Sequence, residues 1–381
     1  MTNSNCLICL LRPIFTYSSI ITTQIVLSCP HRDEKFKIEY SKLFGAISTV
    51  IFLISLTLLI IFYQIFLKST ESIIEVVFII HGMFSYTRMA NLTFFGHLRV
   101  KEKIMELKQL VKVLNEASYY GIEVFLTETT IQRYKTWSVV AITGAALLEG
   151  VFLLSCSFYF DTTLWTLMEQ TTNVFCSFLH VIAVGNYILF GFLYKKLFSV
   201  CLNEMKRDLG EKNCFMVINN KKKFNKLIRL YLKLMKCYEI YGKSAEEIDT
   251  ISLIMYIAMF INTAFLIYIG CYYETINYRF VFNSMQSLSG FIIISFYLFQ
   301  IEGLKHIGND LKSFIFKFPI NSLDSFTSNQ VELALILLEI KTPLIRPLQM
   351  FTVGSSLIVS MFASTITYVL VALQFHVMFS D

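Results

Sequence analysis

Long apolar runs alternate along this chain with polar segments rich in lysine and arginine. A helix needs about 20 predominantly apolar residues to cross the hydrocarbon core of a bilayer. Runs of that length predict seven transmembrane helices, at 43–67, 72–94, 136–160, 166–194, 249–271, 283–301 and 350–378. The pattern therefore predicts an all-α membrane protein.

The polar segments between these runs are predicted to be helical as well. After the second run, Ile104, Leu107, Val111 and Leu114 recur at three- and four-residue spacing, which is typical of one face of a helix. A longer stripe in the same register leads into the fifth run and comprises Phe224, Leu227, Tyr231, Leu234, Tyr238, Tyr241, Ala245 and Ile248. This stripe suits packing within one subunit and a seam between two subunits equally well.

The seventh run is preceded by a short apolar segment, Val331–Ile340, and the two are separated by Pro343 and Pro347. Proline lacks a backbone N–H and breaks a continuous helix. The seventh element is therefore predicted to be split into a helix outside the bilayer and a membrane helix.

A further apolar segment, Ile14–Cys29, lies before the first run and follows Arg12-Pro13. It contains many Ser, Thr, Tyr, Gln and Cys residues, and it lacks the basic region and the cleavage site of a signal peptide. We expect this segment to form an interfacial or bundle-packed helix.

Composition supports the membrane assignment, and the distribution of positive charge predicts an orientation. Hydrophobic residues make up 55% of the 381 residues and charged residues only 16%, which excludes an ordinary soluble domain. Of the 33 Lys and Arg residues, 30 lie in the N-terminal segment and in the loops after the second, fourth and sixth runs. Lys68 and Arg279 alone lie on the opposite side, and Arg88 lies inside the second run. Because positively charged loops stay in the cytoplasm, the N-terminus is expected inside and the C-terminus outside, the reverse of a G-protein-coupled receptor.

The seventh run carries a polar stripe along one helix face. At 100° per residue, the members of this stripe lie within about 40° of one line; they are Ser356, Ser360, Ser364, Thr367, Val371, Gln374 and Met378. Hydroxyl groups in a membrane helix can bond to their own backbone and allow close helix packing. Taken alone, the stripe therefore fits packing between helices somewhat better than a pore.

No catalytic constellation, metal-ligand spacing or phosphate-binding glycine loop is visible, so neither an enzyme nor a bound metal or cofactor is expected. The nine cysteines are expected to be mostly reduced packing residues. The basic run at Lys221–Lys223 is explained by membrane topology and anionic lipid headgroups, and nucleic acid is not expected as a partner.

The end of the seventh run has a more specific spelling, Thr367-Tyr368, five apolar residues and then Gln374-Phe375. It resembles the C-terminal motif of the insect gustatory receptors, a family that is similar to this chain in length, short outer loops and split seventh helix. The resemblance implies a homotetrameric or heteromeric ligand-gated cation channel in the plasma membrane of taste neurons.

The resemblance also assigns roles to parts of the chain. It implies that the helix before Pro343 anchors the subunits to one another and that the stripe lines a pore for Na⁺, K⁺ and Ca²⁺. The expected pore-lining and gate residues are Ser360, Ser364, Thr367, Val371, Gln374 and Phe375, with Val371 as a dry constriction and Gln374-Phe375 at or beside the outer gate. Tyr368 lies off the stripe and is expected to pack against neighbouring helices.

The domain organisation follows from the same resemblance and from the absence of a visible internal repeat. One integral membrane domain is expected over residues 1–381. It divides into a cytoplasmic N-terminal segment (1–42), a six-helix ligand-binding bundle (43–301) with cytoplasmic helical extensions (95–135 and 195–248), and an anchor helix plus pore helix (302–381).

The small-molecule ligand is expected in the outer halves of the second to sixth spans, because the outer loops are too short to form a binding domain. Aromatic walls with a few polar groups are typical of such sites. The candidate ligand-binding residues are Glu149, Phe152, Trp165, Asn173, His180, Tyr268, Gln286 and Phe291. A carboxylate among aromatic rings, such as Glu149, suits a cationic alkaloid.

One position departs from the sugar-receptor branch of the family, which usually has Glu directly after the Thr-Tyr pair. Here that residue is Val369. The departure favours a bitter plant compound as the tastant, with a fructose-type receptor second. An odorant receptor subunit has a similar architecture, and a metabotropic receptor would require an extracellular N-terminus.

Overall fold

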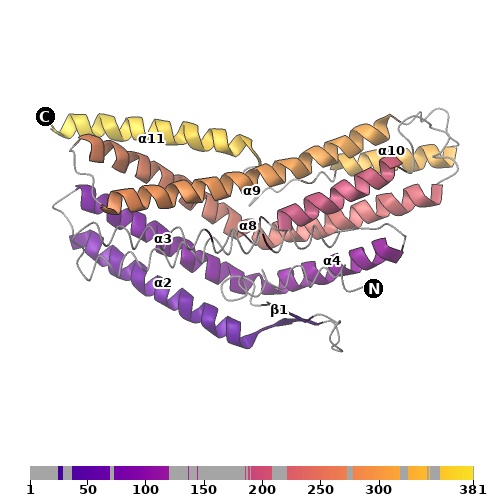
Figure 1. Ribbon diagram of the computed structural model, residues 1–381, viewed down its shortest axis with the longest axis horizontal. Coiled ribbons are helices and arrows are strands. Elements are labelled where there is room, and N and C mark those ends of the chain that lie inside the picture. The colour runs from indigo at the N-terminus through magenta and orange to yellow at the C-terminus, as the bar shows by residue number, and fades with distance from the viewer. Residues whose placement is uncertain are drawn as a thin grey trace.

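The computed structural model describes residues 25–28, 37–68, 73–119, 190–207, 221–272, 278–317, 325–340 and 352–380, together with Thr136, Gly144, Gly185, Ile188 and Pro343. Long helices run roughly along the longest axis of the molecule (Figure 1). They are α2 (Lys42–Lys68), α3 (Ile73–Leu98), α4 (Val100–Tyr119), α8 (Lys221–Tyr272), α9 (Tyr278–Phe316), α10 (Ser325–Ile340) and α11 (Ser356–Ser380). A further helix over 190–207, drawn in pink, carries no label and is called the unlabelled helix below.

The predicted spans that fall within the described residues are confirmed as helices. Lys42–Ile65, Thr250–Tyr268 and Asn283–Phe316 are long and apolar enough to cross a membrane, and Ser356–Val371 is a shorter apolar helix. The predicted second span coincides with α3. The third span and most of the fourth lie outside the described residues.

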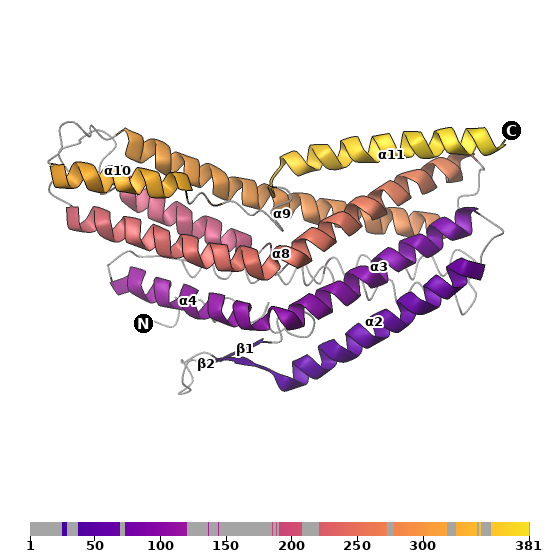
Figure 2. The same cartoon turned by 180° about the vertical axis from the view of Figure 1, so that it is seen from behind.

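The ends of the helices are arranged as the predicted topology requires. The C-terminal ends of α2 and α8 and the starts of α3 and α9 lie at the same end of the molecule as the C-terminal end of α11, whereas α4, α10 and the start of α8 gather at the other end (Figures 1 and 2). The segments with few positive charges are therefore separated in space from the strongly basic ones.

The prediction for the N-terminal segment is wrong at its end, because Ile25–Ser28 forms a strand, β1, and not a helix. β1 pairs antiparallel with β2 (Lys37–Tyr40). Ile25, Leu27 and Ile38 are buried, while Glu39 and Tyr40 are exposed. Ile25 and Leu27 are two positions apart and so lie on the same, buried face of the strand, which explains why the segment pairs as a strand and does not form the predicted helix. The rest of Ile14–Cys29 lies outside the described residues.

The apolar stripe before the fifth span packs within the subunit. α8 is one continuous helix of 52 residues, which bends near its middle (Figure 2), so the stripe and the membrane span belong to the same helix. Leu227, Tyr231, Leu234, Tyr238 and Tyr241 are all buried in the main core. Of the two interpretations of this stripe, the structure supports packing inside one chain.

A buried ion pair lies where α4, α8 and the unlabelled helix meet. Lys103 Nζ is 2.9 Å from Glu106 Oε2, and the Tyr194 hydroxyl donates a hydrogen bond to Glu106 Oε1 at 3.1 Å. The rings of Phe190 and Tyr241 flank Lys103, with centroids 4.2 and 4.9 Å from Nζ. Burial raises the pKa of Glu106, and the charge of Lys103 acts in the opposite direction. The pair joins three segments that are far apart in sequence.

The split of the seventh element is confirmed, since α10 ends at Ile340 and α11 begins at Ser356. Both ends of the intervening segment rest on α9. Pro343 lies so close to Gly308 that a Cβ there would be 2.7 Å from the proline Cδ. At the other end, the Ser355 N–H donates to Glu302 Oε2 at 3.4 Å, which places a carboxylate at the positive end of α11.

The ion pair gives a stability prediction. Glu106→Gln removes the negative charge of this buried ion pair, so we expect the free energy of unfolding to fall by about 3–5 kcal/mol. The double replacement Lys103→Met with Glu106→Leu should recover most of this loss, because a buried pair can be exchanged for apolar side chains at little cost.

The measurement is thermal unfolding of the purified protein in detergent. Glu116→Gln on the same helix is the matched control, because Glu116 pairs with Lys233 at the partly exposed surface and such pairs contribute about 1 kcal/mol or less. An equal shift for Glu106→Gln and Glu116→Gln would show that the buried pair has no special role.

Candidate functional site

The candidate site is centred on α11, which the other described helices contact along one side. In the described structure it packs on α8 and, to a smaller extent, on α9. Met361 and Thr365 are buried, whereas Val359, Ile366 and Leu370 are exposed. Figure 1 shows α11 at the edge of the molecule, with its other side uncovered.

The predicted polar stripe lies on the uncovered part of α11. Ser360, Thr367 and Gln374 are exposed, Val371 is 41% exposed, and Ser364 is partly buried. The Thr367 hydroxyl donates to the Ala363 carbonyl at 2.9 Å, and Ser360 donates to Ser356 in the same way at 3.3 Å. These hydroxyls therefore need no partner from another helix, whereas an amide such as Gln374 is costly to place against lipid.

The motif residue Tyr368 lies beside the stripe and is 59% exposed. The described helices of one chain leave most of its side chain uncovered, and its packing against helices of a neighbouring subunit stays a prediction. The side chain of Phe375 lies outside the described part of α11.

Aromatic rings join α11 to its two partners. Phe260 of α8 stacks on Phe291 of α9 with 5.0 Å between the ring centroids. Phe362 of α11 meets both rings edge-on, at 5.8 and 5.1 Å. A small core of Leu253, Tyr256, Ile294 and Met361 lies beside this trio. These contacts set the position of α11 on the bundle.

Only part of the predicted ligand site can be placed. Tyr268 lies on α8 with a partly buried side chain, and Phe291 belongs to the aromatic trio. Gln286 lies on α9, but its side chain is outside the described set. The remaining candidates also lie outside the described residues, and they are Glu149, Phe152, Trp165, Asn173 and His180.

The structure reveals buried polar groups that the sequence did not single out as ligand-binding. The hydroxyls of Thr263 on α8 and Ser287 on α9 are 2.6 Å apart. Asn283, one turn from Ser287, is buried, and its Oδ1 has no hydrogen-bond partner in the described part of the chain. On α3, His81 and Ser85 are buried on the same helix face. Serine and threonine are too common in helices for spacing alone to have marked Thr263 and Ser287, and a single histidine such as His81 does not show from the sequence which helices it faces.

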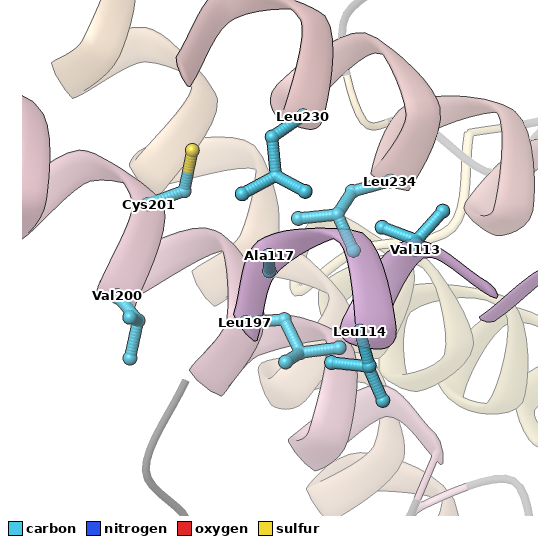
Figure 3. Close-up of a pocket in the computed structure, with 8 residues that line it drawn as sticks. All are labelled: Val113, Leu114, Ala117, Leu197, Val200, Cys201, Leu230 and Leu234. Carbon is cyan, nitrogen blue, oxygen red and sulfur yellow. The ribbon is translucent and has the colours of Figure 1, made fainter. Parts of the chain in front are cut away.

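A small apolar cavity lies at the opposite end of the molecule, between α4, α8 and the unlabelled helix (Figure 3). Aliphatic side chains line it, together with the thiol of Cys201, which donates a weak hydrogen bond to the Leu227 carbonyl. Burial raises the pKa of this thiol to about 12, so it is unreactive at neutral pH. The cavity is far smaller than the roughly 300–1,000 Å³ of a small-molecule site, and it is a packing defect rather than a ligand pocket.

Comparison with known proteins adds a family and a fold. The profile of the 7tm chemosensory receptors matches residues 11–379. Among solved structures, the chain is similar to the insect olfactory receptor OR5 from Machilis hrabei, with a TM-score of 0.65 and 12% identity over 96% of this chain and 97% of that one. The same receptor in complex with eugenol matches with a TM-score of 0.53 and the same identity and coverage. Among curated proteins, no sequence match was found.

The aromatic trio gives a second stability prediction. Phe291→Ala removes the ring that touches both Phe260 and Phe362, so we expect α11 to be less firmly attached and the protein to lose about 2–3 kcal/mol of stability. Thermal unfolding in detergent measures the loss. Phe299→Ala is the control on the same helix, because Phe299 is 57% exposed; an equal effect of both variants would contradict the prediction.

Proposed function

Because the chain belongs to the 7tm chemosensory receptor family, we propose that it is a gustatory receptor, a ligand-gated non-selective cation channel opened by a small-molecule tastant. A bitter plant compound is the favoured ligand, since Val369 replaces the acidic residue that is usual in sugar receptors. The channel lies in the plasma membrane of taste neurons with its N-terminus in the cytoplasm, and it needs no cofactor.

The observation that carries the proposal is the uncovered polar stripe of α11. A single helix with this exposed stripe cannot enclose water, and lipid is a poor solvent for the Gln374 amide. A symmetric ring of four such helices buries the apolar flanks and lines a narrow pore with the stripe. Gln374 then faces the pore near its outer end, and Val371 forms an apolar constriction.

The exposed face of α10 supports assembly into a tetramer. Leu333, Ile336 and Ile340 lie at three- and four-residue spacing and are 52%, 54% and 72% exposed. In the proposed topology α10 lies outside the bilayer, so lipid does not cover this stripe. We propose that the same helix of neighbouring subunits covers it, as the anchor at the centre of the channel.

In this proposal the ligand site is formed by the outer halves of the second to sixth spans, with Glu149 and the aromatic candidates around it. The receptor from Machilis hrabei has been solved in complex with eugenol, a small organic molecule. A site of that chemical class in the bundle of this chain is consistent with aromatic walls and few polar groups.

A second candidate function is an odorant receptor subunit, because the similar solved structure is an olfactory receptor. The two candidates differ in their requirements. A gustatory channel of the proposed kind conducts when this chain, alone or with other gustatory subunits, is present. Dependence of the current on a coreceptor would indicate an odorant receptor subunit.

Ion flux in liposomes tests the proposed function directly. Liposomes that contain the purified tetramers should show a cation flux across their membrane when an activating alkaloid, glycoside or sugar from a panel is added. The absence of evoked flux from intact tetramers across the whole panel would count against a ligand-gated channel.

Two substitutions separate the pore from the ligand site. Gln374→Ala should change conductance or gating, because it removes the outer amide of the stripe, and it should leave the half-maximal agonist concentration nearly unchanged. Glu149→Ala should shift that concentration, by about tenfold for a cationic agonist if one charged contact of about 1.4 kcal/mol is lost. Concentration–response curves measure both, and unchanged curves for both variants would show that these site assignments are wrong.

The anchor is tested by oligomeric state. Replacing Leu333, Ile336 and Ile340 together by Ser should convert tetramers into smaller species, because burial of this helix face between subunits is then no longer favoured by the hydrophobic effect. Light scattering coupled to size-exclusion chromatography measures the mass. Glu332→Ser, an exposed polar position on the same helix, should leave the tetramer intact, and tetramers in the triple variant would contradict the proposed anchor.

A further inference from the structure

Arg88 is a buried cation in the middle of α3. Its side chain is 2% exposed, although a charged group inside a membrane span is costly and usually marks a function. Arg88 Nη1 is 3.6 Å from the sulfur of Met259, and its guanidinium carbon lies 5.0 Å from the ring centroid of Tyr256. Within the described part of the chain, its Nε has no hydrogen-bond partner. The main compensation visible for this charge is therefore the face of an aromatic ring.

The ring of Tyr256 is held on its other side by α9. A Cβ at Gly290 would overlap the edge of this ring, coming within 2.9 Å of its Cδ1 atom and closer still to the neighbouring carbon. Only glycine allows so close an approach between α8 and α9 at this point. The Tyr256 ring is thus closely packed between the guanidinium of Arg88 on α3 and the backbone of Gly290 on α9.

Tyr256 also touches the core that holds α11. It forms a small cluster with Leu253 of α8, Ile294 of α9 and Met361 of α11, and Leu357 of α11 packs against the same cluster. Met361 is the most deeply buried large apolar side chain among the described residues of α11. Arg88, which is on a helix that shares no extensive interface with α11, therefore reaches α11 through a single ring.

We propose that Arg88 is a positioning residue for α11 and acts through Tyr256. The guanidinium fixes the position of the Tyr256 ring by a cation–π attraction. The ring in turn packs against Met361 and so fixes the position of the N-terminal half of α11. A movement of α3 relative to α8 shifts the cation away from the ring. The ring is then free to move, and its packing against α11 weakens. The inference rests on the proposed function, because its consequence is that the position of α3 influences channel opening.

Ring fluorination separates a cation–π attraction from packing. Position 256 is occupied by Phe, or by Phe with one, two or three ring fluorines, through nonsense suppression in oocytes. Fluorine withdraws electron density from the ring face with little change in shape. We expect the ratio of open to closed channels, measured as basal current per channel at the surface, to change progressively and by about tenfold over the series. The same series at Phe299, which is exposed on α9, should show no trend.

Hydrogen–deuterium exchange of the purified full-length protein tests the physical link without any ligand or current. Arg88→Gln should accelerate exchange in residues 356–366 by about tenfold, which corresponds to about 1.4 kcal/mol, while exchange in residues 100–119 stays unchanged. Arg88→Lys retains a cation and should restore most of the protection. Arg99→Gln removes a partly exposed cation just after the same helix and should leave α11 unaffected.

The two experiments distinguish the inference from the function on which it rests. A flat fluorination series in a conducting channel, or unchanged exchange of α11 in Arg88→Gln, overturns the role of Arg88. Acceleration throughout the molecule also overturns it, because it shows a general loss of stability. If the wild-type chain carries no current, the proposed function fails, and the exchange experiment alone decides whether Arg88 positions α11.

Discussion

The arrangement of the described helices depends on the burial of α8. This 52-residue helix is the shared partner of α3, α4, α9 and α11. Its apolar stripe outside the predicted span meets α4 and the unlabelled helix around the Lys103–Glu106 pair. Its membrane part meets α3, α9 and α11 through Tyr256 and Phe260. One continuous helix therefore takes part in both regions and links them.

The two regions are held together by different physics. Toward the end with the buried ion pair, tyrosine and phenylalanine rings surround Lys103, and burial of the charges is compensated by their mutual attraction and by the Tyr194 hydroxyl. Around α11 the contacts are a few rings and aliphatic side chains along one side of the helix. Few buried contacts mean a small free energy for local displacement. Within the described residues, a firmly packed region is therefore combined with a helix that has few buried contacts, as the proposed gate requires.

Sequence reasoning succeeded where a single local property of the chain decides the structure. Apolar length located α2, α8, α9 and α11, and the prolines after Ile340 located the split in the seventh element. It failed at Ile25–Ser28, where period-two burial and pairing with Lys37–Tyr40 outweighed the helical interpretation. It also left the role of the α8 stripe open, because the spacing of Tyr231, Tyr238 and Tyr241 is the same whether their partners come from one chain or from two.

By itself, the sequence determined that this is a membrane protein of long helices, which end carries positive charge, and that α11 bears a polar stripe ending in Gln374. These properties depend on local composition and on helical periodicity, and both can be read without knowledge of neighbours. Only the tertiary structure decided that the stripe is uncovered, that Phe291 joins Phe260 and Phe362, and that Arg88 lies over Tyr256. Such contacts join residues that are tens to hundreds of positions apart, and their existence depends on how side-chain shapes fit when the helices pack.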